Sequence, residues 1–254
     1  MDYETLLDFL RNRRTIRRFK PDPVPDEYVD KVIEAARWAP SGFNLQPWDF
    51  VVVRKPELRE AILGYFRDYH RLMNPVENFR EEWQRVPYHK NRDPESDFKL
   101  APVFIIVLGD TRTLKGLPMS MRHDLERRQT IFTSGLANAY LYMSLAATSL
   151  GLANEWMSVS AVAYPQTQIK HLIGIPPEFD IYDMMALGWP AYKLDSRKLL
   201  RDKAKMVHYD DCGEGDFRTG AEVDDFIRRA RVWTTANHRR GVDGKEEGGV
   251  SDGI

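Results

Sequence analysis

The sequence contains very little cysteine, no long apolar run and almost no excess of charge. Its single cysteine, Cys212, excludes an internal disulfide and a metal site built from several cysteines, and this scarcity is typical of a reducing cytoplasm. No apolar run approaches the roughly 20 residues of a membrane-spanning helix, so a membrane is not an expected partner. The acidic first residues, MDYETLLDFL, do not resemble a secretory signal. We therefore expect a cytoplasmic protein.

The charge balance argues against two further classes of protein. With 37 basic and 38 acidic side chains, the formal net charge is −1, so binding to nucleic acid through bulk positive charge is not expected. The six histidines are scattered without the spacing of metal ligands, so no metal is expected either. Apolar residues make up 43% of the 254 positions, which is enough for a sizeable core in one large or two small domains.

The hydrophobic pattern alternates between strand-like and helical segments. Short apolar or β-branched runs predict strands at 49–54, 101–110, 153–160 and 181–191. Helical periodicity predicts helices at 3–12, 25–40, 55–73, 122–150 and 164–176. Thr219 and Glu222 form a capping box that opens a further helix. Strands that interleave with helices in this way are typical of an α/β or α+β fold.

Two segments lack a clear periodicity. Residues 74–100 are polar and turn-rich and carry several aromatic side chains, and a segment of this length inside a compact domain is usually functional or disordered. The tail at 243–254, DGKEEGGVSDGI, has the composition of a disordered segment.

A cluster of basic residues follows the first predicted helix. The stretch RNRRTIRRFKPDPVP begins at Arg11 and places six arginines and lysines within ten residues, followed by three prolines. The planar guanidinium of arginine suits a phosphate or a carbonyl edge. Several of these side chains could converge where the helix gives way to extended chain. A solvated basic surface is the alternative interpretation.

A second segment, APSGFNLQPWDFVVV at 39–53, joins a predicted helix to a predicted strand. It places Ser41, Gly42, Asn44 and Gln46 in the intervening turn. A small residue lets the backbone approach a planar ligand closely, and amide side chains can hydrogen-bond a heteroaromatic edge. An ordinary helix–strand loop, in which proline and glycine are common, is the alternative.

Together, RRTIRRF at 13–19 and APSGFNLQPWDFVVV at 39–53 resemble the paired motifs of the flavin-dependent nitroreductase family. The order and spacing of the two motifs make the pair far more specific than either motif alone. The resemblance covers most of residues 5–210, through APVFIIVLGD, EWMSVS, IGIPP and LGWPA. It implies an α+β fold with a central, mainly antiparallel sheet wrapped by helices, an intertwined homodimer, and FMN bound across the subunit interface.

The resemblance divides the chain into two expected parts. Residues 1–210 would form the FMN-binding domain, with 74–100 as a substrate lid. Residues 211–254 would form a C-terminal extension with one helix and a disordered tail.

The resemblance also implies which residues contact FMN. The basic cluster would surround the phosphate and the polar edge of the ring, and the second motif would reach the same flavin from the other subunit. EWMSVS would face the ring with its backbone, although Val159 stands where relatives often have glycine. After LGWPA, Arg201 would hold the phosphate; the preceding basic position falls on Leu199, with Arg197 or Lys198 as substitutes. The expected cofactor-binding residues are Arg13, Arg14, Thr15, Arg17, Pro40, Ser41, Gly42, Asn44, Trp156, Met157, Ser158 and Arg201.

The activity implied by the resemblance is that of an NAD(P)H oxidoreductase. NADH or NADPH would reduce FMN, which would then reduce a small aromatic acceptor such as a nitroarene or quinone in a ping-pong reaction. No catalytic side chain is expected, and Arg13 or Arg17 is the candidate for stabilising the anionic reduced ring. The alternatives are a reductive dehalogenase or enone reductase of the same family, and a non-catalytic flavin-binding protein. The deiodinase lid pattern, a Glu with a Tyr four residues later, is absent between 57 and 95.

Overall fold

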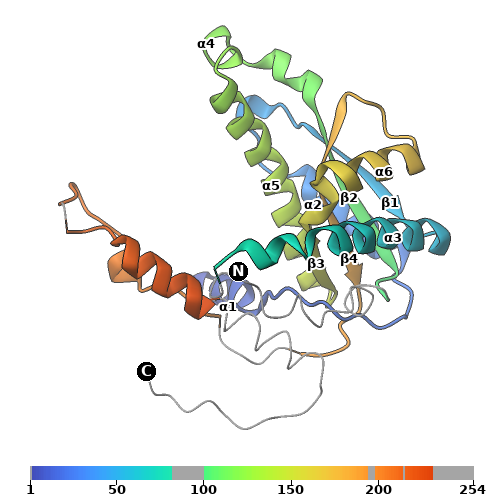
Figure 1. Ribbon diagram of the computed structural model, residues 1–254, viewed down its shortest axis with the longest axis horizontal. Coiled ribbons are helices and arrows are strands. Elements are labelled where there is room, and N and C mark those ends of the chain that lie inside the picture. The colour runs from blue at the N-terminus through green and yellow to red at the C-terminus, as the bar shows by residue number, and fades with distance from the viewer. Residues whose placement is uncertain (1, 82–99, 194–197, 214, 231–254) are drawn as a thin grey trace. The chain divides into compact units, whose positions relative to one another are not determined.

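The computed structural model describes residues 2–81, 100–193, 198–213 and 215–230 (Figure 1). These residues fall into two compact units. The first unit takes those within 1–71 and 93–192, and the second takes those within 72–92 and 193–254. The expected boundary between 210 and 211 stays a prediction.

The first unit is built around a four-stranded sheet. Its strands are β1 (Trp48–Val53), β2 (Val103–Asp110), β3 (Ala153–Met157) and β4 (Phe179–Gly188), in the order β1-β2-β4-β3 (Figure 1). All three neighbouring pairs are antiparallel, which confirms the α+β class. The third strand is shorter than predicted, because the chain turns at Ser158–Ala161 and the Ser160 hydroxyl donates to the Met157 carbonyl at 2.8 Å.

The predicted helices of the first unit are all present. They are α1 (Tyr3–Asn12), α2 (Asp26–Arg37), α3 (Pro56–Met73), α5 (Leu125–Ser149) and α6 (Ala163–Ile173). Helix α5 begins later than predicted, because the Asp124 side chain accepts a hydrogen bond from the Arg127 N–H at 2.9 Å and so caps it. A short helix that the periodicity did not predict, α4 (Met119–Arg122), precedes that cap.

One face of the sheet packs against α2 and α5. Val103, Ile105 and Val107 of β2 lie in one apolar cluster with Met185 and Leu187 of β4. The intervening residues of β2 are buried as well, so both faces of this strand are covered. The two helices contribute these buried side chains to the cluster: Val29, Val32, Ala36, Phe132, Leu136, Ala139, Tyr140, Met143 and Ala147.

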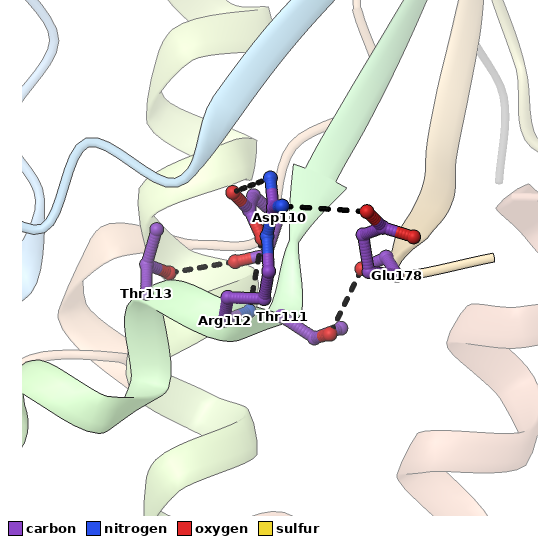
Figure 2. A network of polar contacts seen from close by, with 5 residues as sticks. All are labelled: Asp110, Thr111, Arg112, Thr113 and Glu178. Carbon is purple, nitrogen blue, oxygen red and sulfur yellow. Dashed lines mark hydrogen bonds and ion pairs between the residues drawn. The ribbon is translucent and has the colours of Figure 1, made fainter. Parts of the chain in front are cut away.

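A polar network fixes the end of β2 and the start of β4. Figure 2 shows the Arg112 guanidinium between two carboxylates, 2.8 Å from that of Asp110 and 3.3 Å from that of Glu178. The hydrogen bonds from Arg112 hold the pKa of Asp110 below its ordinary value. The Asp110 N–H also donates to the Pro47 carbonyl at 2.7 Å. The network therefore holds the second sequence motif at Pro47, directly before β1.

The second unit contains the helix predicted from the capping box. Residues 220–230 are helical. The Thr219 N–H donates to the Glu222 carboxylate at 2.9 Å, and the Glu222 N–H donates back to the Thr219 hydroxyl at 3.3 Å. Among the described residues, no helix combines the length and the apolar character that crossing a bilayer requires.

Several predictions fall wholly or partly outside the described residues. Of the expected lid at 74–100, positions 82–99 are not described, and Val76–Phe79 forms a 3₁₀ turn. Arg197 and the tail at 243–254 also lie outside the described residues.

Candidate functional site

The first motif runs along the outer edge of the sheet. Helix α1 ends at Asn12, and Arg13 has an extended backbone. The chain then pairs briefly with the outer strand β3: Thr15 bridges Asn154, and the Ile16 N–H donates to the Asn154 carbonyl at 3.2 Å. The motif is therefore anchored to β3, the strand that carries the third segment of the expected site.

The arginines of the first motif have different surroundings. Burial and the neighbouring charge of Arg14 lower the pKa of Arg13. The Arg17 Nε lies 3.3 Å from the carboxylate of Glu155, which is only 5% exposed on β3. Arg14 donates to the carbonyls of Arg11 and Arg13. Arg17 therefore pairs with β3, Arg13 is half-buried, and Arg14 braces its own backbone.

The second motif packs on helix α5. A Cβ at Gly42 would lie 2.5 Å from the Ile131 Cγ2, so a larger residue cannot occupy this position without displacing the Ile131 side chain, α5 or the loop. The Asn138 side-chain amide donates to the Pro40 carbonyl at 2.9 Å. These contacts fix the start of the loop against a long, rigid helix.

The second motif also carries unusual backbone geometry. Phe43, Asn44 and Gln46 have φ values of 55°, 51° and 44°, in the left-handed region that non-glycine residues rarely adopt. Each such residue costs about 1–3 kcal/mol, and such strain concentrates at ligand-binding sites. The Gln46 N–H donates to the Ser41 hydroxyl, and the Gln46 side chain donates to that of Asn44, both at 3.0 Å. The loop is held in a strained shape with Phe43 54% exposed.

Trp156, in the third segment of the expected site, contacts an aromatic ring of α5 and a carboxylate of β4. The Trp156 ring is 39% exposed and stacks on Tyr140 of α5, with centroids 3.8 Å apart. Its indole N–H donates to the carboxylate of Asp183 on β4. Burial raises the pKa of Asp183 to about 6, although the hydrogen bond from Trp156 acts in the opposite direction. Met157 is buried, whereas Ser158 is exposed where the chain leaves the strand.

Sequence reasoning missed Tyr140, Glu155 and Asp183. The signal for Asp183 was present, because an aspartate interrupts the apolar run IYDMMALG. Tyr140 carried no such signal: it lies in a mixed helix, where its hydroxyl donates to the carbonyls of Glu155 and Met184 at 3.2 and 3.3 Å. Its pKa is raised well above the ordinary value, first of all by burial.

Arg201 belongs to the second unit. Its guanidinium donates to the Lys205 carbonyl at 3.3 Å. Arg201 also lines a pocket with residues of the helix at 220–230. Its expected contact with a flavin phosphate stays a prediction.

The donors in the first unit fit a phosphorylated heteroaromatic cofactor. Arginine guanidiniums suit a phosphate, and the hydroxyls of Thr15 and Ser41 and the amide of Asn44 suit sugar-like hydroxyls and a polar ring edge. They lie on loops held by β3 and α5. Among the described side chains, no group of three or more His, Cys, Asp or Glu residues could hold a metal ion.

Comparison with known proteins assigns the family. The profile of the Nitroreductase family matches residues 10–189, so the chain belongs to this family. It is 29% identical over 194 residues to a proposed NADH dehydrogenase/NAD(P)H nitroreductase of Methanothermobacter thermautotrophicus, covering 76% of this chain and 82% of the relative. It is 30% identical over 187 residues to an NADH dehydrogenase of Thermus thermophilus, covering 70% and 83%.

A solved structure with the same fold is that of an oxidised iodotyrosine deiodinase bound to FMN and 3-iodo-L-tyrosine. The TM-score is 0.61 at 24% identity, and the match covers 82% of this chain and all of the deiodinase chain (100%). At this identity the likeness establishes the fold alone.

Proposed function

We propose that the protein is an FMN-dependent NAD(P)H oxidoreductase that reduces a small, aromatic acceptor. Membership of the Nitroreductase family and the names of its relatives support this proposal. The single observation that carries it is the strained loop at Phe43–Gln46, because it holds the amide side chains of Asn44 and Gln46 on a left-handed backbone of the kind that concentrates at ligand-binding sites.

The proposed flavin contacts come from three segments. The first motif supplies Arg13, Arg14, Thr15 and Arg17, and the second supplies Pro40, Ser41, Gly42 and Asn44. The third supplies Trp156, Met157 and Ser158, and Arg201 would be a phosphate ligand. When bound, FMN would supply the hydride and electron transfer.

The chain's own residues would orient the flavin and set its electrostatic environment. Arg13 or Arg17 would stabilise negative charge at the polar edge of the ring. The indole of Trp156, fixed by its hydrogen bond to Asp183, would keep the end of β3 in place beside the ring. No proton-transferring side chain is assigned.

A homodimer is part of the proposal, because the first unit leaves apolar surface exposed. Helix α1 has no buried residue, and its apolar side chains Tyr3, Leu6 and Leu10 are 69%, 38% and 43% exposed. On α5, Leu141 and Tyr142 are exposed as well. A second copy of the chain would bury such faces, and the second motif of one copy would then complete the flavin site of the other.

The acceptor is proposed only as a class. A nitroarene fits the name NAD(P)H nitroreductase that the Methanothermobacter relative carries. A quinone is the other aromatic candidate. Reductive dehalogenation is the second candidate, because the iodotyrosine deiodinase shares the fold. The absence of a Glu followed four residues later by a Tyr between 57 and 95 disfavours iodotyrosine itself. An enone reductase and a non-catalytic flavin-binding protein are the remaining alternatives.

Anaerobic half-reactions test the proposal. NADH or NADPH should bleach the bound flavin, and nitroarenes, quinones, enones and halophenols should then be compared by the rate at which each restores its colour. Fast reoxidation by a nitroarene or quinone is expected. Bound flavin that neither nicotinamide bleaches would support the non-catalytic alternative instead.

A further inference from the structure

A carboxylate interrupts the buried part of β4. Asp183 is 7% exposed, and it is the charged residue of the otherwise uncharged stretch 181–188. Its partner across the sheet is the buried Val107 of β2. Burial raises the pKa of this carboxyl, and among the described side chains no cation offsets that effect. A buried carboxylate without a cation costs stability, and such groups concentrate at functional sites.

The hydrogen-bond partner of Asp183 is an indole that is held from three sides. The Trp156 N–H donates to the Asp183 carboxylate. One face of the indole stacks on Tyr140 of α5, with centroids 3.8 Å apart and an interplanar angle of 24°. The Tyr182 ring of β4 meets the indole edge-on, with centroids 6.2 Å apart. Both are favoured geometries for aromatic pairs, so together with the hydrogen bond they fix the orientation of the indole.

The fixed indole is nevertheless accessible to a ligand. Trp156 is 39% exposed, whereas Tyr140, on which it stacks, is fully buried. The accessible part of the indole therefore lies on the side turned away from Tyr140. A large aromatic surface that is already held in one orientation loses little conformational entropy when a second ring stacks on it.

This aromatic surface borders the first motif. Burial, followed by the charge of Asp183, raises the pKa of Tyr140, and the positive charge of Arg13 acts in the opposite direction. Arg13 therefore lies within electrostatic range of the ring that supports the indole. Thr15 bridges Asn154, which lies two residues before Trp156 on β3. The accessible side of the indole thus belongs to the same part of the first unit as the expected contacts of the first motif.

We propose that Asp183 is a positioning residue that holds the Trp156 indole so that its accessible side stacks on a planar aromatic ring. The identification of the ligand rests on the proposed function, which supplies two such rings, that of the flavin and that of the acceptor. The resemblance assigned ring contact to the backbone of EWMSVS; the new elements are the indole surface and a carboxylate from a different strand. Asp183 touches neither ring, and its effect passes through Trp156.

This role makes opposite demands on stability and on binding. Removing the buried charge should leave the melting temperature at pH 7.5 at or above that of wild type, because the cost of burying the carboxylate disappears. Removing the hydrogen-bond acceptor should release the half-exposed indole and weaken stacking. A purely structural Asp183 would instead lower the melting temperature and leave ligand affinity unchanged.

Four single variants and one double variant separate the two roles. Asp183→Val removes the charge and the acceptor, whereas Asp183→Asn removes the charge and keeps an oxygen that can accept from the indole. Ser144→Ala is the matched control, because it breaks the buried 3.0 Å hydrogen bond from Ser144 of α5 to Asn154 of β3 in the same helix–strand contact. Trp156→Phe keeps a ring without the N–H. Combined with Asp183→Val, it tests whether Asp183 acts through the indole.

Two probes on the full chain distinguish the flavin from the acceptor. FMN affinity is measured with the apoprotein by quenching of flavin fluorescence. The affinity for 4-nitrobenzyl alcohol is measured with the oxidised, FMN-loaded protein, without any nicotinamide, by the shift in flavin absorbance. The melting temperature of each variant is recorded at pH 7.5. None of these readouts requires turnover.

Each source of the ring has a defined result. If the ring is that of the flavin, Asp183→Val should weaken FMN binding about threefold to tenfold and change the visible circular dichroism of the bound flavin. If it is that of the acceptor, FMN affinity should stay unchanged, and binding of 4-nitrobenzyl alcohol should weaken by about the same factor. In both cases Asp183→Asn should stay within about twofold of wild type. Asp183→Val should have no further effect in the Trp156→Phe background.

The proposal is overturned if Asp183→Val stays within about twofold of Ser144→Ala for both probes, or if Asp183→Asn loses as much affinity as Asp183→Val. It is overturned equally if the loss persists in the Trp156→Phe background, because Asp183 would then act without the indole. A wild-type protein that takes up no FMN would refute this proposal and the proposed function together. Bound flavin that depends on Asp183 but is bleached by neither NADH nor NADPH would refute the proposed activity alone.

Discussion

The Arg17 Nε lies 3.3 Å from the Glu155 carboxylate, so the first motif and β3 are joined by an ion pair as well as by the backbone hydrogen bond from Ile16 to Asn154. Glu155 directly precedes Trp156, which begins the third segment of the proposed flavin site. Two segments far apart in the sequence are therefore held together on the outer strand of the sheet. Arg17 has two candidate roles, one in holding β3 and one in binding the flavin.

Paired substitutions separate these roles. Arg17→Ala and Glu155→Gln both break the ion pair and should each lower the free energy of unfolding by about 1–3 kcal/mol. If Arg17 also contacts the flavin, Arg17→Ala should weaken FMN binding about tenfold more than Glu155→Gln does. Arg11→Ala is the control, since Arg11 forms its ion pair with the exposed Asp8, at 3.0 Å on the surface of α1. Equal losses of FMN affinity in the two variants would leave Arg17 a purely structural role.

Gly42→Ala should disturb the second motif. The added Cβ would meet the Ile131 Cγ2 at 2.5 Å, and overpacking of this kind costs about 1–3 kcal/mol. The melting temperature and FMN affinity should both fall, and a second change, Ile131→Ala, should recover part of the loss. In Gly64→Ala, the control, the nearest atom lies 3.7 Å away at the end of Arg67, so this helical glycine should tolerate alanine. A Gly42→Ala variant as stable as Gly64→Ala would contradict the close packing on α5.

Asp183 should make stability depend on pH in a defined window. Its pKa is raised to about 6 from the ordinary 3.8, so between these values the folded state binds a proton that the unfolded state has lost. The contribution of Asp183 to stability should therefore fall as pH rises from about 4 to about 6, by at most about 3 kcal/mol, and stay level above that. Asp183→Asn, which can still accept from the Trp156 indole, should lack this dependence.

Melting curves of both proteins from pH 4 to 7.5 test this prediction through the difference between them, because other carboxylates titrate equally in both. The stability of Asp183→Asn relative to wild type should increase with pH up to about 6. A difference that is constant over the whole range would show that Asp183 does not titrate there.

The apolar stripe of α1 should be needed for dimerisation. Leu10→Lys places a charge in the exposed stripe that a second copy is proposed to cover, and it should shift the protein toward monomer and lower its FMN content. Glu4→Gln changes the net charge by the same amount on the same helix and should leave the dimer intact. Light scattering with flavin titration provides the measurement. A stable wild-type monomer that holds FMN tightly would contradict the proposed shared site.

The fold could be predicted from the sequence because its elements have strong local signals. The strand at Val103–Asp110 is continuously apolar from Val103 to Leu108, and α2 repeats Val29, Val32 and Ala36 at helical spacing. Boundaries were predicted less well where a side chain decides them. Asp124 starts α5 late, and Ser160 helps to turn the chain after β3.

The candidate site could be predicted only in part. The paired motifs identified the loops, but not the partners that hold them. Ion pairing of Arg17 with Glu155 and stacking of Trp156 on Tyr140 depend on contacts between distant segments, which a single sequence does not encode locally. The left-handed conformation of Phe43 was also unpredicted, because a bulky residue carries no local signal for this geometry.

The most direct test of the proposed function is an absorbance spectrum of the purified protein, followed by chromatography of the cofactor that denaturation releases. The proposal predicts a yellow protein that releases FMN and not FAD, and whose colour bleaches anaerobically with NADH or NADPH. A colourless protein that takes up no added FMN would contradict it.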